Sequence, residues 1–349
     1  MLCRILPVAI ALSSALIYAA SGQDFEQKAE GAAAAIPVKN NEMLEAATAI
    51  KVAMRRYHYN PDELNELEYL KIEAAIMALG HSAVDRDAFL KGFREIWQDA
   101  PFSHVNLRKA RGTAAETATY LDTITVGPDA VQLTWADDDA ILTVNTMMGT
   151  DTVSAITAAY IELEEWGAER LIIDLRQNTG GAFAVRPLVE HLLSHPYDAG
   201  LFVSQNWYAM NARPPSARDL EGLIPWEGWS ITSFWRDVTA TPATRVQFTP
   251  VSPAFTGPAY VLTSKKTASA AELAVDALKG SGRAKIVGEQ TSGAMLSQKP
   301  FDIPGDMLLF LPIADYYSIK NGRIEGHGVV PDIAVDADEA LNFVLAIRE

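Results

Sequence analysis

Cysteine is almost missing from this chain, in which Cys3 is the single example among 349 residues. One cysteine cannot form an internal disulfide, so a disulfide-stabilised scaffold is excluded. If residues 1–22 are removed, as argued below, no thiol remains and cysteine-based catalysis is excluded as well. Export without cysteines fits a bacterial periplasm at least as well as an oxidising eukaryotic lumen.

Positive charge is also scarce, with 29 lysines and arginines against 44 aspartates and glutamates. The net charge of −15 gives no electrostatic basis for binding nucleic acid. Apolar residues make up 49% and charged residues 21%, which is the balance of a globular protein with a large core. The length allows about two domains.

Long apolar runs are absent beyond the first residues. Residues 5–20 carry no charge, follow Arg4 and lead into the small residues 19–22. This pattern predicts a signal peptide over residues 1–22, cleaved before Gln23. An uncleaved membrane anchor is the alternative, although the run is shorter than the ~20 residues that a spanning helix needs. We expect a secreted or periplasmic protein with no stable membrane span after cleavage.

Two segments precede the main part of the chain. Residues 23–40 are rich in alanine, glutamate and glutamine and are interpreted as a tether. Between residues 41 and 110 apolar residues recur at helical spacing, with breaks near 60–62 and 80–82. The pattern predicts a small helical N-terminal domain of about three helices. The helices end before Pro101, which a helix cannot easily cross.

Strands and helices alternate in the rest of the chain. In chain order we expect a strand at 140–144, a helix at 152–166, a strand at 171–173, a helix at 182–193, a strand at 259–263, a helix at 270–278, and strands at 285–287 and 307–312. This alternation is typical of βαβ units with a parallel sheet. Residues 111–349 are therefore predicted to form an α/β core.

An interruption at about 200–256 differs from its surroundings. It holds four of the seven tryptophans, Trp207, Trp226, Trp229 and Trp235, among several prolines. An aromatic, loop-rich insertion between two halves of a sheet suits a lid or a substrate wall. A packing flap with no ligand contact is the equal alternative.

The first candidate for chemistry is the sequence TASAAE at residues 267–272, after an expected strand and opening a helix. Ser269 would lie beside the free N–H groups of a helix N-terminus, which favour negative charge. Ser269 with Glu272 three residues later is also a capping box, which is the structural alternative.

The second candidate is the sequence DLRQNTGG at residues 174–181, between an expected strand and a helix. Two glycines at such a turn can free backbone N–H groups to face a developing oxyanion. The alternative is a tight turn that needs glycine for its φ angle. No complete G-x-G-x-x-G accompanies it, so a dinucleotide site is not expected.

Two of the six histidines, His191 and His195, have the i, i+4 spacing of helical metal ligands. The helical zinc motif requires a glutamate directly after its first histidine, where this chain has Leu192. We therefore expect no metal and no other cofactor.

A nucleophilic serine needs a base. His58 and His81 lie near the breaks of the helical segment and are expected at the surface, while His327 lies in a glycine-rich turn. His104 follows Ser103 just beyond the proline, between the two expected domains, where a cleft would form. His104 is therefore the favoured base.

Four motifs in order resemble the C-terminal processing (tail-specific) peptidase family: DLRQNTGG, TASAAE, VGEQTSG and EGHGVVPD. The resemblance covers roughly residues 100–349. It implies a ClpP/crotonase-like α/β core with the nucleophilic serine at a helix start, behind the small helical N-terminal domain that the periodicity predicts. The spacing between residues 105 and 140 is too short for the PDZ domain that many relatives insert.

The family has a Ser/Lys branch with a lysine directly after the last glycine of the GE-x-T-x-G segment, where this chain has Ala294. The branch that includes the tricorn core protease and interphotoreceptor retinoid-binding protein is more similar. Its tetrad positions match Ser103, His104, Ser269 and Glu325.

The resemblance implies that His104 takes the proton of Ser269, with Ser103 orienting the imidazole and Glu325 behind it. It also implies an oxyanion site of backbone N–H groups, from Ala270 and from one or both of the glycines Gly180 and Gly181.

The expected function is a serine-type endopeptidase or a carboxy-terminal processing protease acting on peptides or unfolded proteins. The main alternative is a non-catalytic peptide- or lipid-binding protein on the same fold, because a fold does not fix a function. An enoyl-CoA hydratase-like enzyme is disfavoured by the expected signal peptide. An α/β-hydrolase is disfavoured because the chain has no G-x-S-x-G sequence.

Overall fold

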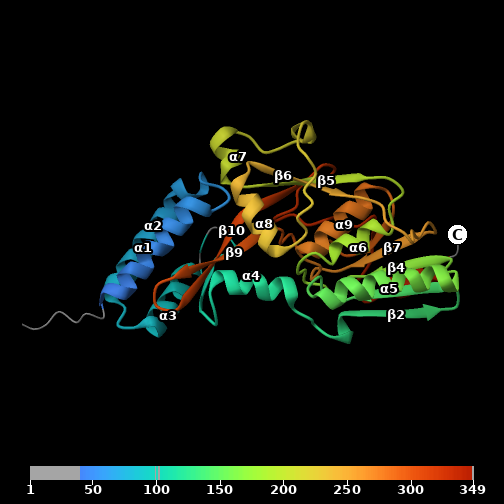
Figure 1. Cartoon of the computed structure of the whole chain (residues 1–349), viewed down its shortest axis with the longest axis horizontal. Helices are drawn as coiled ribbons and strands as arrows, with labels where there is room; N and C mark the ends of the chain where they lie inside the picture. Colours follow the sequence, from blue (N-terminus) through green and yellow to red (C-terminus); the bar gives the residue numbers. More distant parts are fainter. Residues whose placement is uncertain (1–39, 99, 101–102, 348–349) are drawn as a thin grey trace, which may run out of the picture. The chain divides into compact units, whose positions relative to one another are not determined.

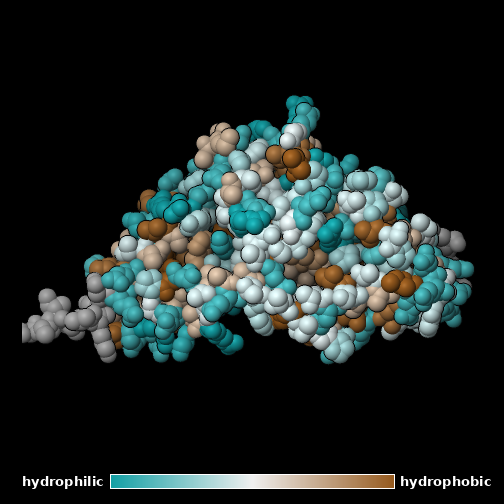
Figure 2. Space-filling view, viewed as in Figure 1, coloured by the Kyte–Doolittle hydropathy of each residue, from teal (hydrophilic) through white to brown (hydrophobic). Residues whose placement is uncertain are grey.

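The computed structural model describes residues 40–98, 100 and 103–347. The expected signal peptide and tether lie outside these residues, apart from Asn40. From residue 39 onward the chain forms one compact unit. Within the described residues no helix is both long enough and apolar enough to span a bilayer. On the face seen in Figure 2, hydrophobic residues are scattered among hydrophilic ones.

The unit begins with three helices, as the periodicity predicts: α1 (Asn40–Tyr57), α2 (Leu67–Ser82) and α3 (Arg86–Trp97). A short 3-10 helix, Glu63–Asn65, fills the break after Asn60. The buried side chains of the three helices share one cluster with residues of the strands β1 (Asn106–Lys109), β9 (Ser297–Ile303) and β10 (Met307–Ser318). The helical layer is therefore integrated with the rest of the unit rather than set apart from it.

The first sheet has six strands in the order β12-β8-β7-β4-β3-β2. Their bounds are β2 (Val131–Ala136), β3 (Asp139–Val144), β4 (Arg170–Asp174), β7 (Ala259–Thr263), β8 (Lys285–Gly288) and β12 (Ile333–Ala334). All neighbours are parallel except β2, which is antiparallel to β3. The parallel sheet expected from the alternation is confirmed.

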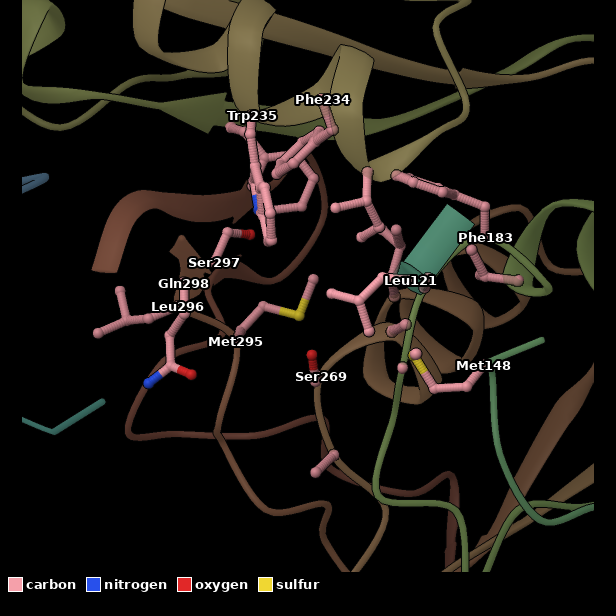
Figure 3. A pocket seen from close by; sticks show the side chains of 18 of the residues that line it. Leu121, Met148, Phe183, Phe234, Trp235, Ser269, Met295, Leu296, Ser297 and Gln298 are labelled. Carbon is pink, nitrogen blue, oxygen red and sulfur yellow. The ribbon is translucent and has the colours of Figure 1, made fainter. Parts of the chain in front are cut away.

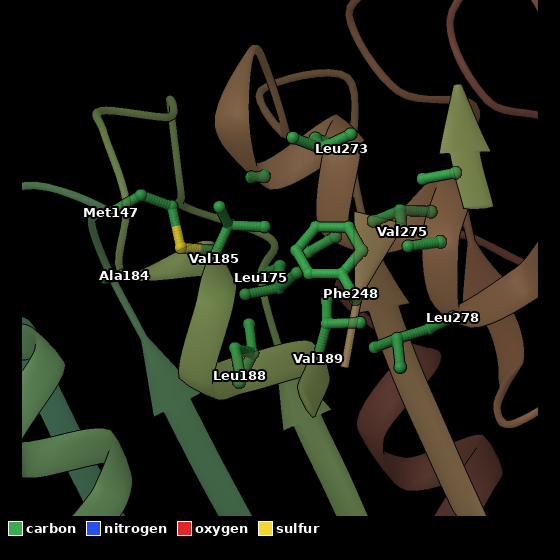
Figure 4. Close-up of a cluster of buried hydrophobic side chains, with 14 of the residues drawn as sticks. Met147, Leu175, Ala184, Val185, Leu188, Val189, Phe248, Leu273, Val275 and Leu278 are labelled. Carbon is green, nitrogen blue, oxygen red and sulfur yellow. The ribbon is translucent and has the colours of Figure 1, made fainter. Parts of the chain in front are cut away.

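Helices cover both faces of this sheet. Leu171 and Ile173 of β4 belong to the main core with α5 (Thr150–Trp166), α6 (Val185–Glu190) and α9 (Ala270–Gly280). Ile172 points the other way and packs with α10 (Ala340–Ala346). Figure 4 shows how α6 and α9 bury apolar side chains against each other.

The helix expected at 182–193 is shorter, because the backbone first makes another set of contacts. Ala182 N and Ala184 N both donate to the carbonyl of Met147, and only then does α6 begin. This arrangement keeps the turn after Gly181 beside Met147, which is buried in the core, and Met148, which lines the cavity beside Ser269.

A second sheet, antiparallel throughout, was not expected from the alternation. Its order is β1-β10-β5-β6, with β9 and β11 also paired to β10. The bounds are β1 (Asn106–Lys109), β5 (Tyr197–Val203), β6 (Ala243–Phe248), β9 (Ser297–Ile303), β10 (Met307–Ser318) and β11 (Gly322–Arg323). β10 is twice as long as the expected strand at 307–312 because it pairs at both ends.

The insertion at 200–256 is more ordered than the loop-rich segment that we expected. It contains the end of β5, α7 (Gln205–Met210), a 3-10 turn (Ala217–Leu220), α8 (Ile231–Ala240) and β6. The strands β5 and β6 are paired with each other, although about forty residues separate them. α4 (Ala114–Thr123) lies beside α8, and the Asp122 carboxylate accepts the N–H groups of Ile231 and Thr232. Figure 1 shows α8 above α4.

Candidate active site

Ser269 lies between β7 and α9, in a backbone conformation that is rare for a residue with a side chain. Its φ is 54° and its ψ is −123°. Holding such a residue at positive φ costs on the order of 1–3 kcal/mol, and conformations of this kind concentrate at functional sites. The surroundings must therefore hold this turn in place.

Glu272 is the main support of the turn and is fully buried. One carboxylate oxygen accepts the N–H groups of Ser269 and Ala294, both at 2.9 Å. The other accepts the Thr291 hydroxyl at 2.6 Å and the Gly293 N–H at 2.7 Å. The capping contact that the sequence suggested is thus present, and Glu272 also binds the Ser269 turn to the segment at 291–294.

The glycine turn lies directly against Ser269. A Cβ atom on Gly180 would stand 2.6 Å from the Ser269 Cβ, so only glycine allows this approach. Gly180 N donates to the Asn178 side chain at 2.8 Å and is therefore occupied. Among the described residues, the N–H groups of Gly181 and Ala270 have no hydrogen-bond acceptor. Of the two candidate glycines, the geometry favours Gly181 over Gly180 as a donor to a ligand.

Ser103, His104 and Glu325 form a hydrogen-bonded chain. The Ser103 hydroxyl donates to Glu325 Oε1 at 3.0 Å, because a carboxylate can only accept. With its single proton used, Ser103 Oγ must accept from His104 Nδ1, at 2.5 Å. The neutral imidazole then carries its proton on Nδ1 and has a lone pair on Nε2, which can accept a proton.

Glu325 is almost buried, at 9% exposure. Its second oxygen accepts the N–H groups of Met295 at 2.6 Å and Leu296 at 3.1 Å. These two residues directly follow the two N–H donors to Glu272. Four successive backbone N–H groups, 293–296, are thus divided between the two buried glutamates.

His104 is held from a third direction by Gln298, whose side chain donates to the His104 carbonyl. His104 has a positive φ of 66°. Its side chain is 22% exposed and its Nδ1 lies 3.7 Å from the nearer Glu325 oxygen. Among the described residues no hydrogen bond joins His104 to Ser269, but both line one cavity of about 400 Å³. Figure 3 shows Ser269 at this cavity, with Met295 to Gln298 on one side of it and Met148, Leu121 and Phe183 on the other.

The cavity wall is mostly apolar, includes seven phenylalanine and tryptophan side chains, and carries no aspartate, glutamate, lysine or arginine among the described residues. Three of the four tryptophans of the insertion contribute to it: Trp226, Trp229 and Trp235. Trp207 belongs instead to a separate cluster with Leu201. The insertion therefore forms part of the wall around Ser269, besides packing against the core.

His58 is buried, with 0% exposure, so the expectation of a surface histidine is wrong. It lies under the end of α1, where its Nδ1 donates to the carbonyl of Asn60. Burial lowers the pKa of His58 to about 4. His81 is exposed, as expected.

The remaining histidines lie away from the cavity. His191 stacks on Tyr160 and donates to the Pro253 carbonyl, and His195 lies against Ser194. His327 lines a different cavity. Among the described residues no group of three or more histidine, cysteine, aspartate or glutamate side chains could hold a metal ion.

A family model described as Peptidase family S41 matches residues 139–335, more than half of the chain. The chain belongs to peptidase family S41. The match takes in the glycine turn, Ser269, Glu272 and Glu325 but begins after Ser103 and His104. The resemblance of the sequence to tail-specific peptidases is thereby confirmed. The case for Ser103 and His104 as site residues depends on the geometry, because the family match does not include them.

Curated relatives of this S41 chain include a carboxyl-terminal-processing protease of Picosynechococcus sp., 26% identical over 174 residues. That match covers 50% of this chain and 34% of the relative. A chloroplastic C-terminal processing peptidase of Tetradesmus obliquus is 29% identical over 188 residues, covering 54% and 33%. The matched part of this chain thus spans about a third of the length of these relatives.

Two solved structures are similar to the S41 unit over most of both chains. A photosystem II D1 C-terminal processing protease aligns with a TM-score of 0.56 and 16% identity, covering 89% of this chain and 98% of the other. A crystal structure described as a putative peptidase from Parabacteroides merdae aligns with a TM-score of 0.58 and 15% identity, covering 90% and 98%. At these identities the likeness shows the fold, and the expected mixed α/β class is confirmed.

Proposed function

We propose that this chain is a serine peptidase in which Ser269 attacks the peptide carbonyl and His104 acts as general base. The observation that carries the proposal is the hydrogen-bonded chain from Glu325 through Ser103 to His104 Nδ1. It leaves Nε2 as the proton-accepting nitrogen of an imidazole that shares a cavity with Ser269. Ala294 stands where the Ser/Lys branch has its lysine, which also supports histidine as the base.

In the proposed reaction, His104 Nε2 takes the hydroxyl proton while Ser269 Oγ bonds to the carbonyl carbon. The carbonyl oxygen becomes an anion and accepts the N–H groups of Gly181 and Ala270. The C–N bond then breaks, and the amine leaves with the proton carried by His104. Water repeats the sequence on the acyl-enzyme, which releases the acid and restores Ser269.

Glu325 stabilises the imidazolium that forms in each step, and Ser103 transmits this effect. The carboxylate is oriented by the N–H groups of Met295 and Leu296. Ser103 fixes the ring so that Nε2 is the nitrogen that exchanges protons. Both residues act through His104 and are therefore positioning residues.

The proposed substrates are peptides or unfolded proteins, cleaved internally or near the carboxyl terminus. Residues 105–140 contribute β1, α4 and β2 to the unit, which supports recognition without an inserted PDZ domain. The apolar run at residues 5–20 supports export to the periplasm or the exterior.

Labelling with a fluorophosphonate probe tests the nucleophile. We expect the probe to modify Ser269, as mapped by mass spectrometry, and Ser269→Ala to abolish both labelling and hydrolysis of unfolded casein. The fold should survive, because loss of a capping serine costs only about 1 kcal/mol. An unlabelled native protein, or full hydrolysis by the variant, would contradict the assignment. Saturable binding of a peptide without turnover would favour a binding protein on this fold.

A further inference from the structure

We infer that the cavity beside Ser269 selects substrates with a large aromatic or branched aliphatic side chain on the residue whose carbonyl is attacked. This inference rests on the proposed peptidase activity. The inference extends the proposed function by naming the substrate class. This class is set by the cavity wall, to which the insertion at 200–256 contributes beside Ser269.

The position of the cavity decides which substrate residue it takes. The base must deliver a proton to the leaving amine, so the leaving group lies on the side of His104 and of Gln298, which binds the His104 carbonyl. Phe183 and Met148 lie on the opposite side of Ser269 from Gln298 (Figure 3). Gly181, whose free N–H would receive the oxyanion, packs against Met148. The acyl residue, which carries the attacked carbonyl, therefore points its side chain toward Phe183.

Phe183 is the centre of an aromatic cluster. Its ring centroid lies 5.7 Å from Trp226, 5.9 Å from Trp229 and 6.2 Å from Phe234. These separations are those of favourable aromatic pairs, so the rings support one another as a fixed wall. Trp226 is further held by its Nε1–H, which donates to the Asp237 carboxylate at 3.0 Å.

The size of the cavity suits a bulky side chain. Its volume is about 400 Å³, whereas an apolar cavity of about 150 Å³ already holds benzene. An alanine side chain would leave most of this apolar surface unfilled. A phenylalanine, tryptophan or leucine side chain would remove much more of it from water.

The absence of charged side chains in the described wall excludes substrates with a charged side chain at the acyl position. Neither an acidic nor a basic side chain would find an opposite charge among the lining residues. Burying an unpaired charge in an apolar site is strongly unfavourable. Substrates with lysine, arginine, aspartate or glutamate at the acyl position should therefore be rejected.

A set of internally quenched peptides that differ only at one position tests this selection. Phenylalanine, leucine, alanine, arginine and aspartate would be compared at the acyl position, with the cleaved bond identified by mass spectrometry. We expect kcat/KM for phenylalanine to exceed that for alanine, arginine or aspartate by roughly 100-fold or more. Equal rates for phenylalanine and alanine would overturn the inference.

Leu121→Asp supplies a sharper test, because it places a carboxylate in the wall from α4. The variant should gain cleavage after arginine by at least roughly 10-fold relative to the native protein and lose cleavage after phenylalanine. Trp166→Ala is the matched control, since Trp166 is 67% exposed and lies outside the cavity. The control should keep the native order of preference. An unchanged preference in a folded Leu121→Asp protein would contradict the assigned wall.

Labelling of Ser269 with the fluorophosphonate probe separates this inference from the proposed activity. A protein that is labelled and cleaves peptides without preference retains the proposed function and loses the inferred substrate class. A protein that is not labelled fails at the proposed function. If a fatty acid binds tightly and blocks the probe while no peptide preference exists, the cavity is a lipid site and the inference is wrong.

Discussion

At the scale of single residues, the proposed mechanism depends on one hydroxyl besides that of Ser269. Ser103 joins His104 to Glu325, which lies 222 positions later in the chain. A serine can both donate and accept, so it transmits the position of the carboxylate to the imidazole while fixing its tautomer. In the proposed mechanism, the Glu325 carboxylate, 3.7 Å from Nδ1, therefore acts on the ring through Ser103.

Removing Ser103 and Glu325 together should slow hydrolysis scarcely more than removing the more important one alone. The two residues form one chain to His104, and residues that act as a unit have non-additive effects. Steady-state kcat for Ser103→Ala, Glu325→Gln and the double variant measures this, with each single change costing roughly 10- to 100-fold.

His327→Ala is the control for this series, because His327 lies two residues from Glu325 but lines another cavity. It should retain native kcat. Loss of turnover in His327→Ala, with the other three variants active, would require a different base.

Burial of His58 should make the protein less stable in acid. The unfolded chain takes up the histidine proton near pH 6.5, whereas the folded-state pKa is about 4. The unfolded state therefore binds more protons between these values, and the free energy of unfolding falls as pH decreases from 6.5 toward 4. The full effect is on the order of 3 kcal/mol.

Urea unfolding of the native protein and of His58→Gln at pH 7 and pH 4.5 measures this effect, with the exposed His81→Gln as control. The His58 variant should lose less stability on acidification than the native protein or the control. Glu63, whose carboxylate lies 3.9 Å from His58 Nε2, is the charge that could oppose the effect. Equal acid sensitivity of all three proteins would show that Glu63 compensates for the burial.

At the scale of elements, the segment at 291–298 connects the surroundings of Ser269 to those of His104. Its first half is bound by Glu272 at the start of α9, and its second half by Glu325. At its end, Gln298 enters β9 and binds the His104 carbonyl. The relative position of Ser269 and His104 is therefore set by one short piece of backbone between two buried carboxylates.

Glu272→Gln should lower kcat by roughly 10- to 100-fold without changing the preference for the acyl side chain. The amide nitrogen of the glutamine would replace one carboxylate oxygen, so the backbone or hydroxyl donors that bind this oxygen would lose their acceptor. An unsatisfied buried donor costs about 1–3 kcal/mol. The Ser269 turn would then shift relative to His104. Single-turnover kinetics with the fluorophosphonate probe measures the reactivity of Ser269 directly.

Asp276→Asn is a matched control on the same helix. Asp276 is equally buried and accepts from Tyr316, Ser318 and Asn321, none of which belongs to the cavity. We expect both variants to lose stability and only Glu272→Gln to lose reactivity per folded molecule. Comparable loss of reactivity in both would mean that Glu272 has a structural role alone.

At the scale of the whole molecule, the helical layer and the second sheet share one core. Phe89 and Phe93 of α3 pack in the same cluster as Leu309 and Leu311 of β10. β10 also pairs with β5, which pairs with β6, and with β11. The same strand therefore connects the helical layer to the insertion and to the segment that leads to Glu325. The layer is thus part of the support for the site.

Phe89→Ala should lower the stability of the whole unit rather than of the helices alone. Phe89 is fully buried, and such a change costs about 3–5 kcal/mol. Far-ultraviolet circular dichroism and tryptophan fluorescence should report one common transition at a lower midpoint. Leu67→Ala, at a residue 60% exposed on α2, is the control and should hardly shift it. Two separate transitions would mean that the helices unfold independently.

The sequence predicted the elements with strong local patterns. The three helices, the parallel strands and the helix after Ser269 follow from apolar periodicity, from runs of buried residues and from turn residues. It did not predict the antiparallel sheet, because β5 and β6 are paired across a long connection that has no local signature. The burial of His58 was missed for the same reason: β10 covers the end of α1, with Tyr59 N donating to the Pro312 carbonyl.

What the sequence by itself determined is the set of chemical groups: a serine at a helix start, a pair of glycines, a Ser-His pair and a late glutamate. Tertiary structure alone decided how these groups are connected. In the folded protein the Gly180 N–H donates to Asn178, whereas the Gly181 N–H has no acceptor among the described residues and is free to bind a ligand. The N–H groups of residues 293–296 donate to two different glutamates. Local patterns depend on neighbours along the chain, whereas hydrogen bonds between distant segments depend on how the sheets bring those segments together.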